Sequence, residues 1–371
     1  MGARGSGFHA WQMLMLLVLV ASGCGRATGI RALDGSSLPV ITGGSGGSGS
    51  SGGSGGPPRD PVKATYDAVD PVQLNQRLRD MTGADPVDIG GQQQLITNRY
   101  SPASKALFRA YWMQYYTLLG MQVTEMPYTT QHNNGETQGH NAEAILPGKD
   151  ADSVVIIVHY DSIGPAGQET QNPGVDDDMT GMATQLETAR ILASQRDKLQ
   201  HTIRFVAADY EEWAAPGLEG ARQYAEYIKN LAQTRGFRIL AAIDNEQSGW
   251  NCASDAACAA SEGGTIVDVF SCSTENPPTY DFKAIGDAFD NLAAKYSALS
   301  TNRDCMGQNS DHYAMWEIGV PAVVFSEHIP FDNPHFDEKG GDTIDKIDHE
   351  YHLHIAQLGA AFAAQLAGLA P

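Results

Sequence analysis

The chain has 371 residues, of which 44 are acidic and 24 are Lys or Arg, so its formal net charge is −20; 42% of the residues are hydrophobic. This composition excludes a collagen-like, a fully disordered or a multi-span membrane protein. The acidic charge argues against nucleic acid or anionic lipid as a partner, because both need clustered Lys and Arg.

Residues 1–24 have the pattern of an export signal. Arg4 is followed by the apolar run 11–20, and small residues at 21–23 lead to Cys24. Ten residues of helix rise only about 15 Å, too little for a hydrocarbon core of about 30 Å, so we expect a signal peptide rather than a membrane span. Small residues before a cysteine resemble a lipobox, which predicts lipidation of Cys24; ordinary signal cleavage is the alternative.

A flexible linker follows the signal. Residues 43–56 are fourteen consecutive Gly or Ser, and the whole segment 25–58 should behave as a coil with an r.m.s. span of roughly 30–35 Å. We therefore expect one folded domain, residues 59–371, that is exported and either held to the cell envelope through Cys24 or released as a periplasmic or secreted protein.

The pattern of the body predicts an α/β three-layer sandwich with a mostly parallel central sheet. Asp70-Pro71 and Ser101-Pro102 are capping pairs that begin two helices, which end at Gly83 and Gly120. Continuously apolar strands then alternate with helices, as in parallel sheets that are covered on both faces. The expected strands are 153–159, 202–208, 237–244 and 321–326, and the expected helices are 180–194, 217–233, 281–297 and 347–369.

Four cysteines remain after Cys24: Cys252, Cys258, Cys272 and Cys305. An even number in an exported chain predicts two disulfides. Proximity in sequence favours Cys252–Cys258 and Cys272–Cys305. Zinc binding by all four is the alternative, but their spacing lacks the close pairs of structural zinc sites.

Metal-binding residue types stand where the inner strands end. His159 closes the first strand, Glu211-Glu212 follows the second after Asp209-Tyr210, and Asp244 closes the third. Ligands of open α/β sheets bind at the carboxyl ends of the strands. Three contiguous acids, 176–178, precede a helix; capping explains one or two of them, and a cation would offset the repulsion among the three.

These segments resemble the co-catalytic di-zinc aminopeptidases, whose relatives include glutamate carboxypeptidases and glutaminyl cyclases. The matching segments occur in the family's order: His159-Tyr160-Asp161-Ser162, Pro173 to Asp178, Glu211-Glu212, Ile243-Asp244 and Ser310-Asp311-His312. The resemblance implies two Zn²⁺ ions per chain. It implies that His159 and Asp244 bind one, that Glu212 binds the other, that Asp176 bridges them, and that Glu211 is the general base.

General chemistry supports these roles. Two zinc ions about 3.5–4 Å apart can share one hydroxide, and an unligated Glu211 could take the proton of water and return it to the leaving amine. Asp161 could orient the imidazole of His159; a structural salt bridge is the alternative for Asp161.

The fifth ligand departs from the family pattern. The family's last histidine usually lies four residues before an Asp-Thr pair, but here Glu338 stands four residues before Asp342-Thr343. We expect His335 to be the ligand, with His312 as its rival.

A second histidine cluster, 349–354, resembles a metalloprotease helix. The required second histidine is replaced by Leu353, so we expect a solvated helix face.

The sequence thus predicts an exported zinc-dependent aminopeptidase that acts on peptides. The alternatives are a carboxypeptidase or a glutaminyl cyclase of the same fold, or a non-catalytic binding module stabilised by a metal. Side-chain preference and oligomeric state do not follow from the sequence.

Overall fold

The computed structural model describes residues 60–130, 136–212, 217–275, 277–336 and 339–371. The predicted signal, Cys24, the linker and Glu338 lie outside these residues. Within the described ranges, no helix is long and apolar enough to cross a membrane.

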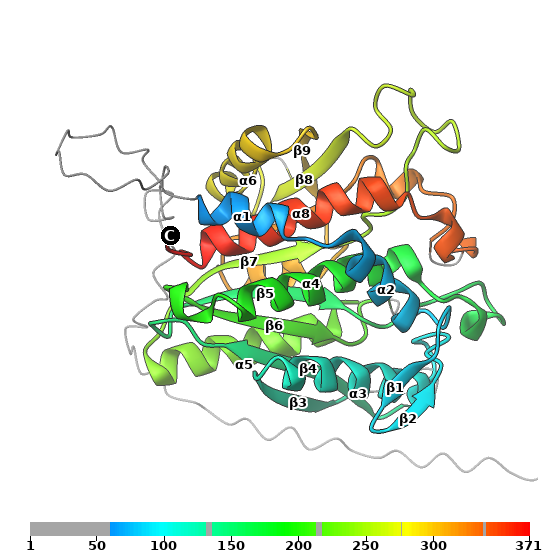
Figure 1. Cartoon of the computed structure of the whole chain (residues 1–371), viewed down its shortest axis with the longest axis horizontal. Helices are drawn as coiled ribbons and strands as arrows, with labels where there is room; N and C mark the ends of the chain where they lie inside the picture. Colours follow the sequence, from blue (N-terminus) through cyan, green and yellow to red (C-terminus); the bar gives the residue numbers. More distant parts are fainter. Residues whose placement is uncertain (1–59, 131–135, 213–216, 276, 337–338) are drawn as a thin grey trace, which may run out of the picture. The chain divides into compact units, whose positions relative to one another are not determined.

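A mixed sheet of eight strands forms the centre of the domain, in the order β3-β4-β6-β5-β7-β10-β8-β9 (Figure 1). The neighbouring strands β6, β5, β7 and β10 are parallel, whereas β3 runs antiparallel to β4, β4 to β6 and β8 to β10; β9 runs parallel to β8. The predicted, mostly parallel centre is therefore confirmed. The strands are β3 (Gln122–Thr129), β4 (Gln138–Leu146), β5 (Ser153–His159), β6 (Thr202–Ala208), β7 (Ile239–Asn245), β8 (Ile266–Ser273), β9 (Ser300–Met306) and β10 (Ala322–Glu327).

Helices cover both faces of this sheet and complete the three layers. One face carries α1 (Pro61–Asp67), α2 (Pro71–Met81), α3 (Pro102–Leu118), α4 (Gly181–Ala193), α6 (Lys283–Tyr296) and α8 (His349–Leu366). The other face carries α5 (Glu219–Arg235) and α7 (His312–Glu317). A small hairpin, β1 (Val87–Ile89) and β2 (Gln92–Gln94), pairs separately.

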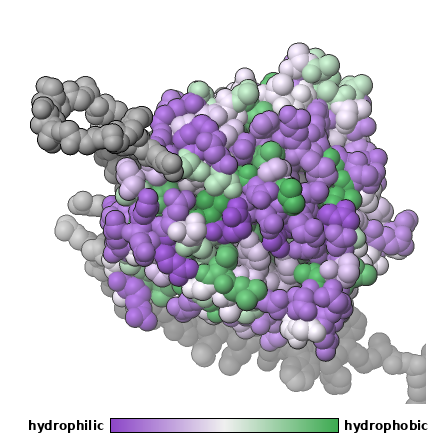
Figure 2. Space-filling model, viewed as in Figure 1, coloured by the Kyte–Doolittle hydropathy of each residue, from purple (hydrophilic) through white to green (hydrophobic). Residues whose placement is uncertain are grey.

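The apolar strands divide their side chains between two cores. In β5, Val154, Ile156 and Val158 pack into the first core, and Val155 and Ile157 pack into the second. Because both faces are buried, the strand needs no polar alternation. On the outside, polar residues cover most of the viewed face and apolar residues form small separate patches (Figure 2).

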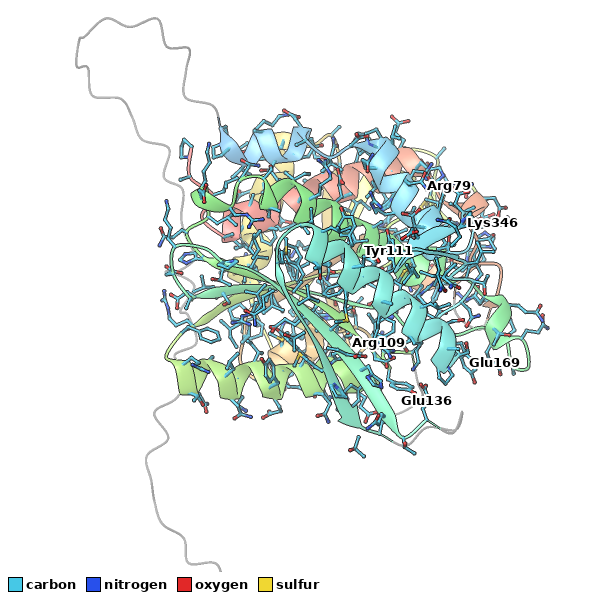
Figure 3. The ribbon with its side chains drawn as sticks, turned by 60° about the horizontal axis from the view of Figure 1, so that its bottom comes forward. Arg79, Arg109, Tyr111, Glu136, Glu169 and Lys346 are labelled. Carbon is cyan, nitrogen blue, oxygen red and sulfur yellow. A yellow bond between two sulfur atoms is a disulfide. The ribbon has the colours of Figure 1, made fainter. Side chains whose placement is uncertain are left out.

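Helix α3 ties the N-terminal region to the sheet. Tyr111 Oη donates to Asp80 Oδ2 of α2 at 3.0 Å, and Arg109 Nη1 donates to Tyr160 Oη at 3.0 Å. Figure 3 labels these two side chains on different sides of α3. The caps of the opening helices form as predicted, with Asp70 Oδ1 accepting from the amide of Val72 at 2.8 Å.

Both predicted disulfides are present, Cys252–Cys258 and Cys272–Cys305.

The expected solvated face of the last helix is wrong at His352. This side chain is 1% exposed, and its Nε2 lies 3.0 Å from the carbonyl oxygen of Thr180, which precedes α4. Burial lowers the pKa of His352 to about 4, so the ring is neutral at pH 7. The histidine belongs to the contact between α4 and α8.

Candidate metal centre

The parallel strands bring the predicted chemistry to one edge of the sheet. His159 is the last residue of β5 and pairs in register with Ala208, the last residue of β6. Asp244, near the end of β7, lies beside the same part of β5. Glu211 and Glu212 follow β6 after Asp209 and Tyr210. All four residues therefore reach the carboxyl end of the sheet, where ligands of this class of fold bind.

Three side chains converge closely enough to hold one ion. A ligand atom from each of His159, Asp177 and Glu212 lies within 4.8 Å of the other two. His159 Nε2 is 3.1 Å from Asp177 Oδ1, and both side chains are at least nine-tenths buried. One imidazole with two carboxylates is a donor set that suits zinc.

The structure brings Asp177, rather than the expected Asp176, next to His159. Asp176 Oδ1 accepts from the amide of Gly249 at 2.8 Å, and its Oδ2 accepts from the Asn333 side-chain amide at 2.9 Å. These bonds turn Asp176 away from His159, whereas Asp177 faces it. These contacts therefore favour Asp177 over Asp176 as the ligand beside His159.

A long-range contact sets the direction of this turn. Asp342 Oδ1 accepts from the amide of Asp176 at 2.7 Å, and Asp342 Oδ2 accepts from that of Asp177 at 3.0 Å. Asp178 Oδ1 accepts from the amide of Gly181, the first residue of α4, at 3.0 Å. The three contiguous acids thus differ in their contacts. Asp176 accepts hydrogen bonds from two loops, Asp177 faces His159, and Asp178 accepts from the amide of the first residue of α4.

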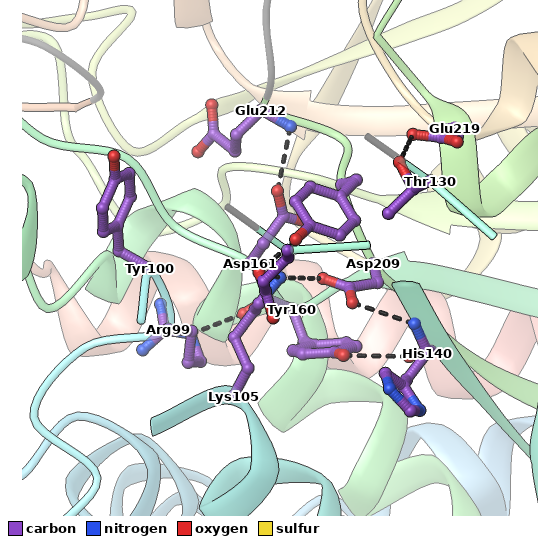
Figure 4. Close-up of polar contacts among 12 residues, drawn as sticks. Arg99, Tyr100, Lys105, Thr130, His140, Tyr160, Asp161, Asp209, Glu212 and Glu219 are labelled. Atoms are coloured by element: carbon purple, nitrogen blue, oxygen red, sulfur yellow. Dashed lines mark hydrogen bonds and ion pairs between the residues drawn. The ribbon is translucent and has the colours of Figure 1, made fainter. Parts of the chain in front are cut away.

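Asp161 contacts both the glutamate pair and the imidazole: its carboxylate binds the amides of Glu211 and Glu212, and its backbone carbonyl oxygen lies 3.3 Å from His159 Nδ1. Its two carboxylate oxygens accept from the amides of Glu211 at 3.0 Å and Glu212 at 3.1 Å, and the second of these bonds is drawn in Figure 4. The shortest distance from the His159 ring to the Asp161 carboxylate is 3.8 Å. The Asp161 carboxylate thus fixes the Glu211 and Glu212 amides, while the nearest Asp161 contact of the imidazole is its backbone carbonyl oxygen.

Asp244 is held from the side of α7. Its Oδ2 accepts from Ser310 Oγ at 2.5 Å and from the amide of His312 at 2.9 Å. The ring of His312 is fully buried, and its Nδ1 lies 3.4 Å from the same oxygen. The rival histidine ligand thus stands behind Asp244, and it is not part of the group formed by His159, Asp177 and Glu212.

His335, the histidine expected as the fifth metal ligand, contacts Asp255 instead of the group formed by His159, Asp177 and Glu212. Its Nε2 lies 3.0 Å from Asp255 Oδ2. Both side chains line a cavity of about 390 Å³ together with Asn251, Ser254, Asp345, Lys346, Ile347 and Asp348. The structure does not bring His335 into the group of three.

Further polar atoms near the site fit a cation. Glu246 Oε2 and both carboxylate oxygens of Asp311 are buried without a hydrogen-bond partner among the described residues. The carboxylates of Glu246 and Asp311 each interact electrostatically with the same three residues: Asp244, Glu211 and His159. Buried acids without donors are costly unless a positive charge is present, so the donor set fits bound metal. The sequence assigned no role to Glu246, although it stands two residues after Asp244, directly past the end of β7.

Burial and charge perturb the pKa values of this cluster strongly. Burial raises the pKa of Glu211 to about 8; His159 opposes the rise, and Asp177, Asp161 and Asp244 add to it. Burial lowers the pKa of His159, but its contact with Asp177 and the other carboxylates outweigh that effect and hold the pKa well above its usual value. Strongly shifted groups of this kind are characteristic of functional sites.

A family model confirms the resemblance. The model of peptidase family M28 matches residues 141–363, more than half of the chain. The chain belongs to this family. The matched region contains His159, Asp177, Glu211, Glu212 and Asp244.

Individual relatives agree with the M28 assignment. A probable leucine aminopeptidase of Arthroderma otae is 28% identical over 63% of this chain and 62% of its own length; the chain thus spans about three fifths of the curated relatives it matches. Among solved structures, the LapA aminopeptidase of Legionella pneumophila has a TM-score of 0.62 at 20% identity, covering 83% of this chain and 75% of LapA. A glutaminyl cyclase of Macrostomum lignano has a TM-score of 0.63 at 17% identity, covering 86% and 97%. At these identities the solved structures establish the fold alone.

Proposed function

We propose that this M28 protein is a zinc-dependent aminopeptidase that hydrolyses the first peptide bond of a peptide. The observation that carries the proposal is the buried group of His159, Asp177 and Glu212 with Glu211 beside it at the carboxyl edge of the sheet. The probable leucine aminopeptidase of Arthroderma otae supports the choice of an amino-terminal substrate.

We expect two zinc ions per chain, and the residues that would hold them are His159, Asp177 and Glu212, which converge on one point, together with Asp244. Three ligand carboxylates offset most of the charge of two Zn²⁺, so Glu211 is not needed as a ligand. When bound, zinc supplies a Lewis acid for the peptide carbonyl and activates water for attack.

The protein's own contribution to the chemistry is a positioned base. Asp161 fixes the amides of Glu211 and Glu212, which holds one glutamate as the base and the other as a ligand. Burial raises the pKa of Glu211 to about 8, and zinc bound beside it would lower this pKa. Glu211 then accepts the proton of water and passes it to the leaving amine.

We also propose that the domain is exported and works on a flexible tether. The apolar run 11–20, the small residues before Cys24 and the Gly/Ser segment 43–56 support this arrangement. Labelling of Cys24 with a radioactive fatty acid in cells, compared with a Cys24→Ser chain, tests the lipid anchor.

The activity is tested by metal analysis and one matched pair of variants. Purified protein should contain close to two zinc ions per chain and should cleave peptides with a free amino terminus. Glu211→Gln should keep the zinc and lose at least ~100-fold in kcat, since general-base catalysis typically contributes 10²–10⁴-fold. Glu226→Gln, an exposed change on α5, should leave both unchanged. A Glu211→Gln protein of wild-type activity would refute the mechanism.

The choice among reactions is tested with the substrate. Cleavage that survives a blocked carboxyl end and stops with an acetylated amino end supports an aminopeptidase. The opposite pattern indicates a carboxypeptidase. Ring closure of an amino-terminal glutamine without peptide cleavage indicates a glutaminyl cyclase, the activity named for one structural neighbour.

A further inference from the structure

Arg99 is a buried cation that the predicted chemistry did not include. It lies in the loop before α3 and its side chain has no exposed surface. Its guanidinium donates to three carbonyl oxygens: from Nε to Tyr160 at 2.8 Å, from Nη2 to Gly174 at 2.7 Å and from Nη1 to Met81 at 3.2 Å. Figure 4 shows Arg99 beside Tyr160 and Asp161, on the side of the site formed by the loop before α3.

Two of these carbonyls belong to the segments that carry the proposed ligands. Tyr160 stands between His159 and Asp161, and Gly174 begins the turn that presents Asp177. The third carbonyl belongs to Met81, the last residue of α2. One planar guanidinium therefore joins both ligand-bearing segments to a helix end, and a fork of five donors is the geometry that such a three-way contact needs.

The fit around Gly174 is tight. Its backbone has φ +57°, and a Cβ there would come within 2.5 Å of Arg99 Nη2. The close approach of the guanidinium thus depends on a glycine at the start of the turn. The amide of Arg99 also donates to Ser162 Oγ at 3.0 Å, so its backbone is attached to the same segment as its side chain.

Arg99 also places a positive charge beside the acids of the site. Burial lowers the pKa of Arg99 to about 10, while Asp342, Asp161, Asp177 and Glu212 oppose the decrease. The side chain therefore remains charged at pH 7. Its guanidinium donates to carbonyl oxygens, so its charge is available to several carboxylates of the site at once.

From these contacts we infer that Arg99 is a positioning residue of the metal centre: it sets the spacing between the His159 and Asp177 segments and so determines the affinity for zinc. The inference rests on the proposed zinc-dependent activity. Arg204 serves as the control for a purely structural role. It is also buried, but it pairs with Glu143 at 2.8 Å near the start of β6, at the opposite end of the strand from the metal centre.

The test compares Arg99→Lys with Arg204→Lys. Both changes keep a positive charge and remove the planar fork from a buried site. Zinc affinity of metal-depleted protein is measured by competition with a chelator of known affinity, at a temperature where circular dichroism shows every variant folded. We expect Arg99→Lys to bind zinc ~10–100-fold more weakly, the loss typical of a partner that orients metal ligands. Arg204→Lys should stay within about 2-fold of wild type if the effect is local.

The outcomes separate this inference from the activity itself. Wild-type zinc affinity in Arg99→Lys, with peptide cleavage intact in the parent, would overturn the role of Arg99 and leave the proposed function standing. Equal losses in both variants would also overturn it, because they would indicate general destabilisation. A parent protein that binds no zinc would overturn both proposals. If Arg99→Lys fails to fold, Arg99→Gln, which keeps two side-chain donors, takes its place under the same criteria.

Discussion

Protonation of His352 should destabilise the domain between pH 7 and pH 5. Its pKa is lowered from 6.5 to about 4 by burial between α4 and α8. In that window the unfolded chain binds more protons than the folded chain, so the stability present above pH 6.5 is lost as the pH falls toward 4. With these two values, the loss on going from pH 7 to pH 5 is about 2 kcal/mol from this one group.

The assay is urea denaturation of the wild type and of His352→Gln at both pH values. Glutamine carries no charge at either pH and can donate to the Thr180 carbonyl in place of Nε2, so the variant lacks this proton linkage. The difference in unfolding free energy between the two proteins should therefore change by about 2 kcal/mol from pH 7 to pH 5. His354→Gln, a half-buried position on the same helix, controls for the loss of an imidazole. A difference that stays constant within about 0.5 kcal/mol would refute the linkage, since that is the spread expected from independent effects.

Two further predictions concern the site and the disulfides. Asp177→Asn should weaken zinc binding by more than the ~10–100-fold typical of a residue that only orients a metal ligand. Asp176→Asn should lower the zinc affinity by less than about 10-fold, because Asp176 contacts protein groups. Both affinities are measured by zinc titration, and equal losses would indicate that Asp176 is also a ligand. Replacing Cys272 and Cys305 by Ser should lower the unfolding free energy by about 4 kcal/mol, and the same change at Cys252 and Cys258 by about 2 kcal/mol, because the bridges span 33 and 6 residues. Denaturation of both double variants in urea checks the order, and the reverse order would contradict the loop-closure argument.

The inner strands could be predicted closely because burial on both faces leaves a simple pattern. The observed bounds of β5 and β6 equal those expected from the sequence. The strands β3, β4, β8 and β9 of the central sheet were not predicted. In two of them polar residues conceal the pattern: Glu143 in β4 is buried against Arg204, and β9 has alternating exposed residues at the edge of the sheet.

The residue types of the site could be predicted from the sequence, but the choice between adjacent residues of the same type could not. Strand ends revealed His159, Glu211, Glu212 and Asp244, since each follows an apolar run. The choice between Asp176 and Asp177 could not be made locally, because identical neighbours differ only in their contacts with Gly249, Asn333 and Asp342. Arg99 has no local signal either, since its role depends on carbonyl groups 61 and 75 residues away in sequence.

The two hydrogen bonds that Asp342 accepts affect when the metal centre can assemble during synthesis of the chain. His159, Asp177 and Glu212 all leave the ribosome well before Asp342, which lies 165 residues beyond Asp177. The turn that presents Asp177 has no carboxylate to receive its amides until that late segment arrives. A nascent chain that ends before Asp342 therefore carries the proposed ligand side chains without the support that arranges them, so we expect the centre to assemble only after residue 342 has been made.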